Sequence, residues 1–225
     1  MLCFDSIVLL HQRGFLCVFA RFFGHLQVQR FVGCVFCRLS LPRVYPCHMR
    51  KLKNEELNRI SVEEFKNKKK NPLVIVMDNV RSMNNVGSAF RTADAFSIDH
   101  IYLCGITARP PHREITKTAL GATESVDWTY CEQTTDCLQY LKQQGYCVVL
   151  VEQTDSSIML QDFRPESKQK YAFVFGNEAF GISDEALAYA DQSLEIPQHG
   201  TKHSINISVC LGITVWDFLS KRGLN

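Results

Sequence analysis

Four short apolar runs constrain the fold of this chain more than any other feature. They are LVIVMD (73–78), IYLC (101–104), YCVVLVE (146–152) and YAFVFG (171–176). Each has the length of a strand and lacks the polar alternation of a half-exposed one, as in strands buried on both faces of a parallel sheet. Helical patterns over 84–97 and 134–144 lie between them. We therefore expect an α/β domain with a mostly parallel sheet flanked by helices.

Weaker patterns complete this prediction. VDWTY (126–130) and SLEIP (193–197) have the length of short strands, and residues 53–66 read as a charged helix. The helix over 84–97 is expected to take Asn84 or Asn85 as its N-cap.

The first 48 residues differ from the rest of the chain. They contain five arginines and one acidic residue, a balance of +4, so residues 49–225 carry −2 of the net charge of +2. Their charges interrupt every apolar run before the roughly 18 residues of a membrane span, and no signal-peptide cleavage site is clear. We interpret residues 1–48 as an atypical, poorly ordered extension from a start codon placed too far upstream. Residues 49–225 are expected to form a single domain, in the cytoplasm.

The ten cysteines are interpreted as reduced, mostly buried thiols, because disulfides persist in oxidising compartments. Cys34 and Cys37 have the spacing of zinc ligands, but no second pair matches them, so we expect no metal site. The chain has no GxGxxG, Walker or HExxH motif. Their absence argues against dinucleotide oxidoreductases, P-loop NTPases and zinc proteases.

Three polar clusters follow predicted strands, where open parallel sheets bind ligands. The first, DNVRSMNNVGSAFRTADAF (78–96), places Arg81 and Asn85 between a strand and a helix, with Arg91 further along. Free amides at a helix N-terminus beside an arginine form an anion site. An asparagine-capped helix with a surface arginine would give the same pattern.

The second cluster is VFGNEAFGIS (174–183), in which two glycines permit tight turns around Glu178. This carboxylate is expected either to cap a helix or to face a ligand. The third cluster, EIPQHGTKHSINISVC (195–210), leads into an apolar helix through Ser204, Asn206 and Ser208. A helix cap requires only one of these residues, so we expect this loop to wrap a polar ligand.

Together the clusters resemble the SpoU (TrmH-like) family of RNA ribose methyltransferases, in the SPOUT superfamily, over about residues 72–221. NNVGSAFRTADAF, FGNEAFGIS and IPQHGTKHSINISVCLGI are similar to the family's three motifs, in order. The resemblance implies a C-terminal trefoil knot, S-adenosylmethionine as cofactor, and methylation of a ribose 2′-hydroxyl in RNA. It also implies a homodimer through the C-terminal helix, with a surface supplied by Trp216, Phe218 and Leu219.

The resemblance assigns residues to two roles. The catalytic residues are Asn85, Arg91, Glu178, Ser204 and Asn206. The cofactor-binding residues are Gly176, Asn177, Ile196, Ile205 and Ser208. Arg91 is the principal catalytic residue of the family. Because a guanidinium is a poor general base, we expect Arg91 to hold an RNA phosphate and orient the hydroxyl.

Many relatives carry a separate N-terminal RNA-binding domain, for which residues 49–70 are too short. RNA is therefore expected to contact basic residues of the domain itself, namely Arg81, Lys68, Lys69, Lys70, Arg109, Arg113 and Lys117. The substrate is tRNA or rRNA, with tRNA slightly favoured by analogy. Two alternatives remain open at this point: an inactive RNA-binding protein of the same fold, and an α/β protein that binds another nucleotide.

Overall fold

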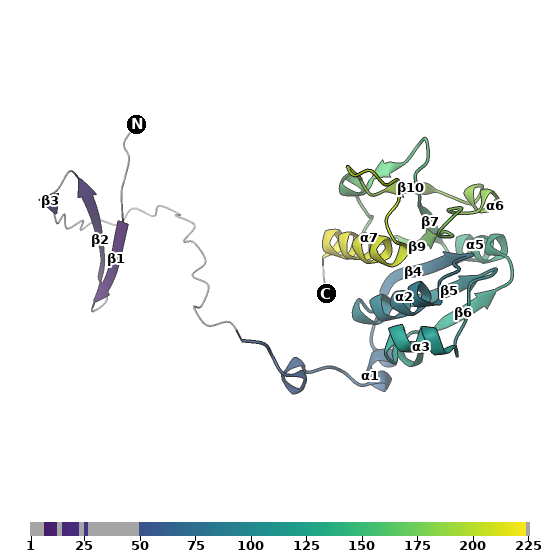
Figure 1. The fold of residues 1–225 in the computed structure, drawn as a ribbon, viewed down its shortest axis with the longest axis horizontal. Coiled ribbons are helices and arrows are strands. Elements are labelled where there is room, and N and C mark those ends of the chain that lie inside the picture. The colour runs from purple at the N-terminus through teal and green to yellow at the C-terminus, as the bar shows by residue number, and fades with distance from the viewer. Residues whose placement is uncertain (1–6, 13–14, 23–24, 27–49, 224–225) are drawn as a thin grey trace. The chain divides into compact units, whose positions relative to one another are not determined.

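The computed structural model describes residues 7–12, 15–22, 25–26 and 50–223, which divide into two units, Met1–Lys53 and Asn54–Asn225 (Figure 1). In the first unit, β1 (Ile7–Gln12), β2 (Phe15–Phe22) and β3 (His25–Leu26) form an antiparallel sheet. No sequence pattern predicted these strands. The interpretation of residues 1–48 as an extension stays a prediction, and Cys34 and Cys37 lie outside the described residues.

The second unit contains a seven-stranded sheet in the order β6-β5-β4-β9-β7-β10-β8, in which every pairing is parallel. Its strands are β4 (Asn71–Asp78), β5 (Ile98–Cys104), β6 (Trp128–Cys131), β7 (Tyr146–Val151), β8 (Ile158–Met159), β9 (Lys170–Phe175) and β10 (Gln192–Glu195). Every predicted strand is present, so the predicted parallel α/β architecture is confirmed. β8 was not predicted.

Helices cover both faces of this sheet. The helices of the described chain are η1 (Asn54–Leu57), which has no buried residue, α1 (Val62–Asn67), α2 (Met83–Ala95), α3 (Arg113–Ala119), α4 (Ala122–Ser125), α5 (Thr134–Gln143), η2 (Leu160–Asp162), α6 (Asp184–Leu187) and α7 (Ile207–Arg222). No helix in the described part of the chain is long and apolar enough to cross a membrane.

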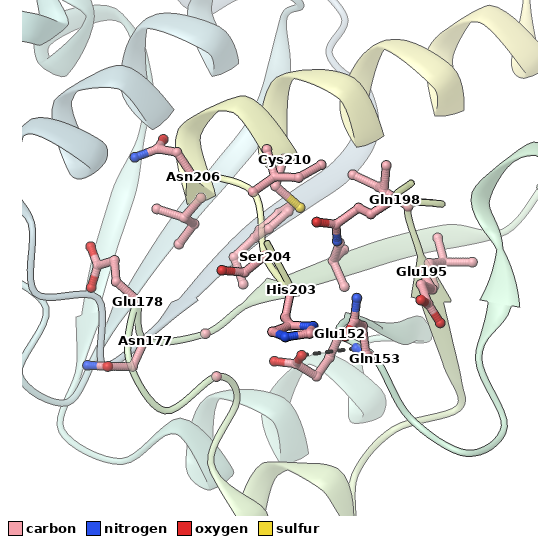
Figure 2. A pocket seen from close by; sticks show the side chains of 18 of the residues that line it. Glu152, Gln153, Asn177, Glu178, Glu195, Gln198, His203, Ser204, Asn206 and Cys210 are labelled. Carbon is pink, nitrogen blue, oxygen red and sulfur yellow. Dashed lines mark hydrogen bonds between the residues drawn. The ribbon is translucent and has the colours of Figure 1, made fainter. Parts of the chain in front are cut away.

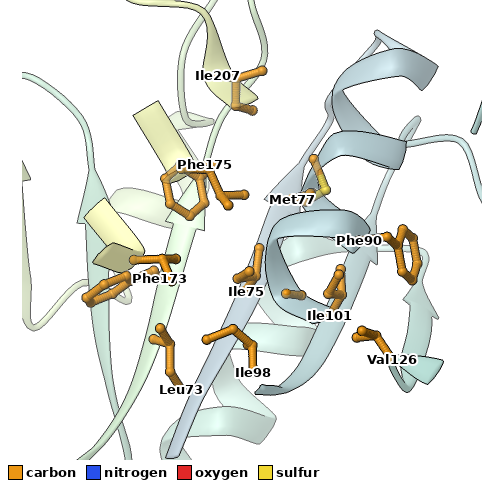
Figure 3. Close-up of a cluster of buried hydrophobic side chains, with 14 of the residues drawn as sticks. Leu73, Ile75, Met77, Phe90, Ile98, Ile101, Val126, Phe173, Phe175 and Ile207 are labelled. Carbon is orange, nitrogen blue, oxygen red and sulfur yellow. The ribbon is translucent and has the colours of Figure 1, made fainter. Parts of the chain in front are cut away.

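Successive side chains of each strand point to opposite faces of the sheet, so the core consists of two clusters. Leu73, Ile75 and Met77 of β4 pack on the face that carries α2 and α7 (Figure 3). Val74 and Val76 pack on the opposite face, which α5 and α6 cover. Burial on both faces explains why β4 reads as a continuous apolar run.

Two helical boundaries differ from the prediction. The expected helix over 53–66 is interrupted, because Asn58 has a positive φ of 44° and Ser61 starts α1 through a capping box with Glu64. The N-cap of α2 is Ser82, whose Oγ accepts the Asn85 N–H at 3.3 Å. Neither Asn84 nor Asn85 caps this helix.

The C-terminal helix α7 packs against α2 and β9. Its Phe218 makes edge-on contacts with the rings of Tyr171 and Phe173. Phe218 and Leu219 are buried in the core of their own chain, so the prediction that they supply a dimer surface is wrong. Trp216 is 52% exposed, as that prediction requires.

Candidate functional site

A cavity of about 340 Å³ lies at the carboxyl ends of β7, β9 and β10 (Figure 2). Three segments line it: residues 151–153 at the end of β7, residues 175–181 from the end of β9 onward, and residues 194–210 from the end of β10 to the first turn of α7. These segments are distant in sequence, but neighbouring parallel strands bring their carboxyl ends together. The volume is in the range of small-molecule sites.

The lining of the cavity combines apolar walls with convergent polar groups. The apolar side chains are Val151, Phe175, Leu194, Ile196, Ile205, Ile207 and Cys210. Three carboxylates also line it, from Glu152, Glu178 and Glu195 (Figure 2). Such a lining suits a ligand with a flat apolar part and with hydroxyl or cationic groups.

The segment after β9 folds into the predicted tight turn. Asn177 and Gly181 exchange two backbone hydrogen bonds, at 2.8 and 2.9 Å. Gly181 has a φ of +73°, and a Cβ there would lie 2.5 Å from Oε2 of Glu152. A Cβ on Gly176 would lie 2.2 Å from the carbonyl carbon of Gly181. Both positions therefore require glycine for this turn to close over the cavity.

Glu178, inside this turn, reaches across to the N-terminus of α2. Its Oε2 accepts the Arg81 N–H at 2.9 Å, and its Oε1 accepts the Ser82 N–H at 3.0 Å and the Asn85 side-chain amide at 2.8 Å. The oxygen of the same Asn85 amide accepts from Asn206 at 3.3 Å. A chain of hydrogen bonds therefore joins one residue from each of the three polar clusters.

These contacts set the charge of Glu178. Partial burial pushes the pKa of its carboxyl upward, but hydrogen bonds from Arg81, Asn85, its own N–H and Ser82 outweigh burial, so the pKa lies below its ordinary value. The carboxylate is thus ionised at neutral pH and already engaged. Glu178 accepts the N–H groups of Arg81 and Ser82 directly before α2, whose N-cap is Ser82, and it also lines the cavity. The chain's own carboxylate therefore occupies the N–H groups that precede this helix, and the expectation that Glu178 faces a ligand stays a prediction.

The loop before α7 supplies the other wall of the cavity. Ser204 is exposed and lines the cavity. Asn206 caps α7, because its Oδ1 accepts the N–H of Ser208 at 2.9 Å and the hydroxyl of Ser208 at 2.6 Å. Ser208 is therefore held at the cap and is not among the lining residues. The other predicted cofactor-binding residues, Gly176, Asn177, Ile196 and Ile205, all line the cavity.

Arg91 lies elsewhere. It is exposed on α2, six residues beyond Asn85, and lines a second concavity of about 440 Å³ between α2 and α3, together with Lys117, Ser88 and Thr118. Gly87 permits this close packing, since a Cβ there would lie 1.9 Å from Oγ1 of Thr118. The structure thus does not bring Arg91 into the cavity, which Glu178, Ser204 and Asn206 line and to which Asn85 is joined by hydrogen bonds to Glu178 and Asn206.

The remaining predicted RNA-binding residues are spread over the surface. The Arg109 guanidinium lies 4.3 Å from the centre of the Tyr130 ring, and the Arg113 side chain is 93% exposed. Arg81 and Lys69 are also exposed. Lys68 and Lys70 are partly engaged, because Lys68 donates to Ser97 at 2.9 Å and Lys70 lies over the Phe65 ring.

The sequence prediction did not include Glu152 and Gln153, whereas Glu195, Gln198 and Cys210 line the cavity from within the predicted third cluster, although none of them was assigned a role. Oε2 of Glu152 accepts the Ile182 N–H at 3.1 Å and so fixes the turn after β9. The sequence could have indicated Glu152 as a site residue, because it directly follows a strand and parallel sheets bind ligands at the carboxyl ends of their strands. His203 is exposed and also lines the cavity (Figure 2).

Curated relatives of this chain act on two kinds of RNA, according to their names. The chain is 26% identical over 168 residues to a 23S rRNA (guanosine-2′-O-)-methyltransferase from Neisseria meningitidis, covering 74% of this chain and 66% of the relative. It is 28% identical over 171 residues to a tRNA (guanosine(18)-2′-O)-methyltransferase from Thermus thermophilus, covering 74% and 84%. The chain thus spans only part of the length of each.

Solved structures show the same fold. A putative RNA methyltransferase of the TrmH family from Porphyromonas gingivalis superimposes with a TM-score of 0.59 at 30% identity, covering 65% of this chain and 58% of that one. An AdoMet-bound rRNA methyltransferase from Sinorhizobium meliloti superimposes with a TM-score of 0.62 at 25% identity, covering 68% and 57%.

The family model of the SpoU rRNA Methylase family matches residues 72–216, which hold all of the seven-stranded sheet except Asn71, the cavity and most of α7. The predicted family resemblance is confirmed: this chain belongs to the SpoU rRNA Methylase family.

Proposed function

We propose that this chain is an S-adenosylmethionine-dependent methyltransferase that methylates a ribose 2′-hydroxyl in structured RNA. The observation that carries the proposal is the hydrogen-bonded chain of Glu178, Asn85 and Asn206, which joins the three polar clusters beside a cavity of cofactor size. The names of the curated relatives agree with this reaction and include both tRNA and rRNA enzymes. We favour tRNA slightly, by analogy alone.

S-adenosylmethionine fits the cavity by its chemistry. Apolar walls suit its adenine ring, and carboxylates suit its hydroxyl, amino and sulfonium groups. Gly176, Asn177, Ile196 and Ile205 would hold the cofactor, and Ser208 would act indirectly by fixing Asn206. When bound, the cofactor supplies an activated methyl group.

The residues of the chain contribute mainly alignment. Glu178 and Asn85 fix the turn after β9 against α2, and Asn206 fixes the loop that carries Ser204. Arg91 and Lys117 offer two cations in one concavity, which suits a phosphate of the RNA backbone. Glu178 is a poor proton acceptor because its carboxylate is engaged and its pKa is lowered. Arg91 is also a poor acceptor because its guanidinium stays protonated.

We propose further that the protein acts in the cytoplasm and, as a separate point, that the chain between β10 and α7 forms a trefoil knot. Two observations support the knot. β10 lies beyond β7 in the strand order, whereas α7 packs against α2, which follows β4. The loop of residues 196–206 must therefore return past the carboxyl ends of β7 and β9, and it lines the same cavity as the turn after β9.

A homodimer through α7 is part of the same proposal. Val209, Ile213 and Trp216 follow one another at helical spacing and are 50%, 39% and 52% exposed. An exposed apolar stripe on a helix is typical of an interface. Light scattering should give twice the chain mass for the wild type and a lower mass for Ile213→Glu. A wild-type monomer would contradict this part of the proposal.

The reaction is tested with the purified full chain, S-adenosylmethionine labelled in its methyl group, and separate pools of tRNA and rRNA that lack the modification. We expect label in RNA, recovered after nuclease digestion as a 2′-O-methylated nucleoside. Lys168→Ala, which removes an exposed cation outside both concavities and outside the predicted RNA-binding residues, is the control and should stay active. Label on a base would contradict the reaction. RNA binding without any transfer would favour the inactive RNA-binding protein.

A further inference from the structure

Three cysteines converge on the α5 face of the sheet, away from the residues that line both concavities. Cys104 ends β5, and Cys131 ends β6 as its register partner. Cys137 lies in the first turns of α5, which packs over both strands. The three Sγ atoms lie within 4.8 Å of one another, and no other group of three or more His, Cys, Asp or Glu residues in the described ranges could hold a metal ion.

The spacing of these thiols is close to that of a metal site. Zinc–sulfur bonds of about 2.3 Å in tetrahedral geometry place sulfur atoms about 3.8 Å apart. A contraction of about 1 Å or less would bring the three sulfurs to that spacing. The ligands are also on regular elements, because two come from adjacent strands of one ladder and the third from a helix.

The surroundings favour a bound cation. Asp78 is fully buried at the end of β4, and its carboxylate accepts from Thr134 at the start of α5, from Asn79, and from the N–H and hydroxyl of Ser183 at 2.8 Å. It therefore anchors the start of the helix that carries Cys137 and adds a negative charge nearby. Cys104 and Cys137 are 0% and 2% exposed, whereas Cys131 is half-buried and leaves a route for an ion.

We propose that Cys104, Cys131 and Cys137 form a binding site for a thiophilic metal ion of the zinc type, separate from the proposed methyl transfer. Three thiolates are soft ligands that select such ions over magnesium or calcium. Binding releases the thiol protons to solvent, and water completes the fourth position beside Cys131. We expected no metal site from the sequence, because Cys34 and Cys37 lack a second pair. Cys104, Cys131 and Cys137 are 27 and 6 residues apart, and only the fold brings them together.

Site-resolved alkylation of the reduced, metal-free full chain tests the site, with zinc ion as the probe. Each cysteine is read separately by peptide mass spectrometry, so the cysteines of residues 1–48 do not confuse the result. We expect one equivalent of zinc to slow alkylation of Cys131 at least tenfold. Cys147, also half-buried but on β7, is the matched internal control and should react at the same rate with and without zinc.

Two variants complete the test. In Cys137→Ser, zinc should no longer protect Cys131, whereas in Cys147→Ser the protection should remain. Circular dichroism shows whether Cys137→Ser is folded. If it is not, elemental analysis of Cys131→Ser should show one zinc ion fewer per chain than the wild type. Equal alkylation of Cys131 with and without zinc, or protection that survives in folded Cys137→Ser, would overturn the proposal.

Discussion

The two concavities beside α2 have opposite chemical character. The cavity at the carboxyl ends of β7, β9 and β10 is lined by three glutamates and by one ionisable base, His203. The concavity between α2 and α3 is lined by Arg91 and Lys117 and by no acidic residue. The first suits a ligand with cationic groups, and the second suits a polyanion. This difference fits a cofactor on one side of the helix and RNA on the other.

Two residues of one sequence motif, Asn85 and Arg91, lie in different surroundings. Asn85 is 8% exposed and is held through its side chain by Glu178 and Asn206. Arg91, six residues later, is exposed in the basic concavity. Residues that are close in a motif therefore have different tasks: Asn85 orders the walls of the cavity, and Arg91 is available to a second ligand.

The largest expected effect comes from Arg91→Ala. Loss of this cation should lower turnover at least about 100-fold, since groups that position and stabilise reacting charges typically contribute that much. Affinity for S-adenosylmethionine, measured by calorimetry, should stay within about twofold because Arg91 does not line the cavity. Lys168→Ala is the control and should keep wild-type turnover. Loss of cofactor binding together with turnover would show that the two concavities are not independent.

Gly181→Ala should damage the cavity and spare the basic concavity. The new Cβ would meet Glu152 at 2.5 Å, and the backbone has a φ of +73°. We expect cofactor affinity to fall roughly tenfold, from a strain of about 1–2 kcal/mol, while RNA affinity stays unchanged. Gly145→Ala is a close control, because its φ is +79° but a Cβ there meets nothing within 4 Å. Equal losses of cofactor affinity in both variants would argue against a specific role for Gly181.

Glu178→Gln tests how a carboxylate holds the cavity against α2. The folded-state pKa of Glu178 lies below its ordinary value of 4.5, so the carboxylate stabilises the fold fully above about pH 4.5. This contribution is lost as pH falls through the folded-state pKa. At neutral pH the variant should lose about 1 kcal/mol of unfolding free energy, because glutamine keeps one acceptor oxygen.

Melting temperatures of wild type and Glu178→Gln should therefore converge as pH falls below 4.5. Glu185→Gln changes an exposed glutamate on α6 and serves as the control, with little effect expected at any pH. A difference in melting temperature that stays constant from neutral to acid pH would show that the charge of Glu178 does not stabilise this contact.

The smallest effect is expected for Lys117→Ala. One phosphate contact fewer should weaken RNA binding only a few-fold and reduce the slope of log affinity against log salt by about 1. Lys168→Ala, which removes an exposed lysine outside both concavities, should leave this slope unchanged. An unchanged salt slope in Lys117→Ala would place the RNA backbone away from the basic concavity.

The sheet could be predicted from sequence because strands such as β4 and β9 are buried on both faces and must be apolar throughout. Most of the cavity could be predicted because its walls follow strands, as Gly176 and Ile196 do. The short helices α3, α4 and α6 were not predicted, since segments of 7, 4 and 4 residues hold too few turns for a clear period.

Contacts between distant residues account for the other misses. Asn85 looked like an N-cap, but Glu178, 93 positions away, takes its side chain, and Ser82 caps the helix instead. Arg91 could not be placed relative to the cavity, because its neighbour Lys117 belongs to a helix that no pattern indicated. Local propensity contains no information on such pairs, which only the packing of the sheet determines.

The proposed reaction is the methylation of a ribose in cellular RNA by this chain. The most direct test maps ribose methylation in total RNA, by nuclease digestion and mass spectrometry, in cells with the gene, without it, and complemented with wild type or Arg91→Ala. We predict that one 2′-O-methylated nucleotide disappears on deletion, returns with the wild type and does not return with Arg91→Ala. An unchanged set of ribose methyl groups, in cells that express the protein, would contradict the proposal.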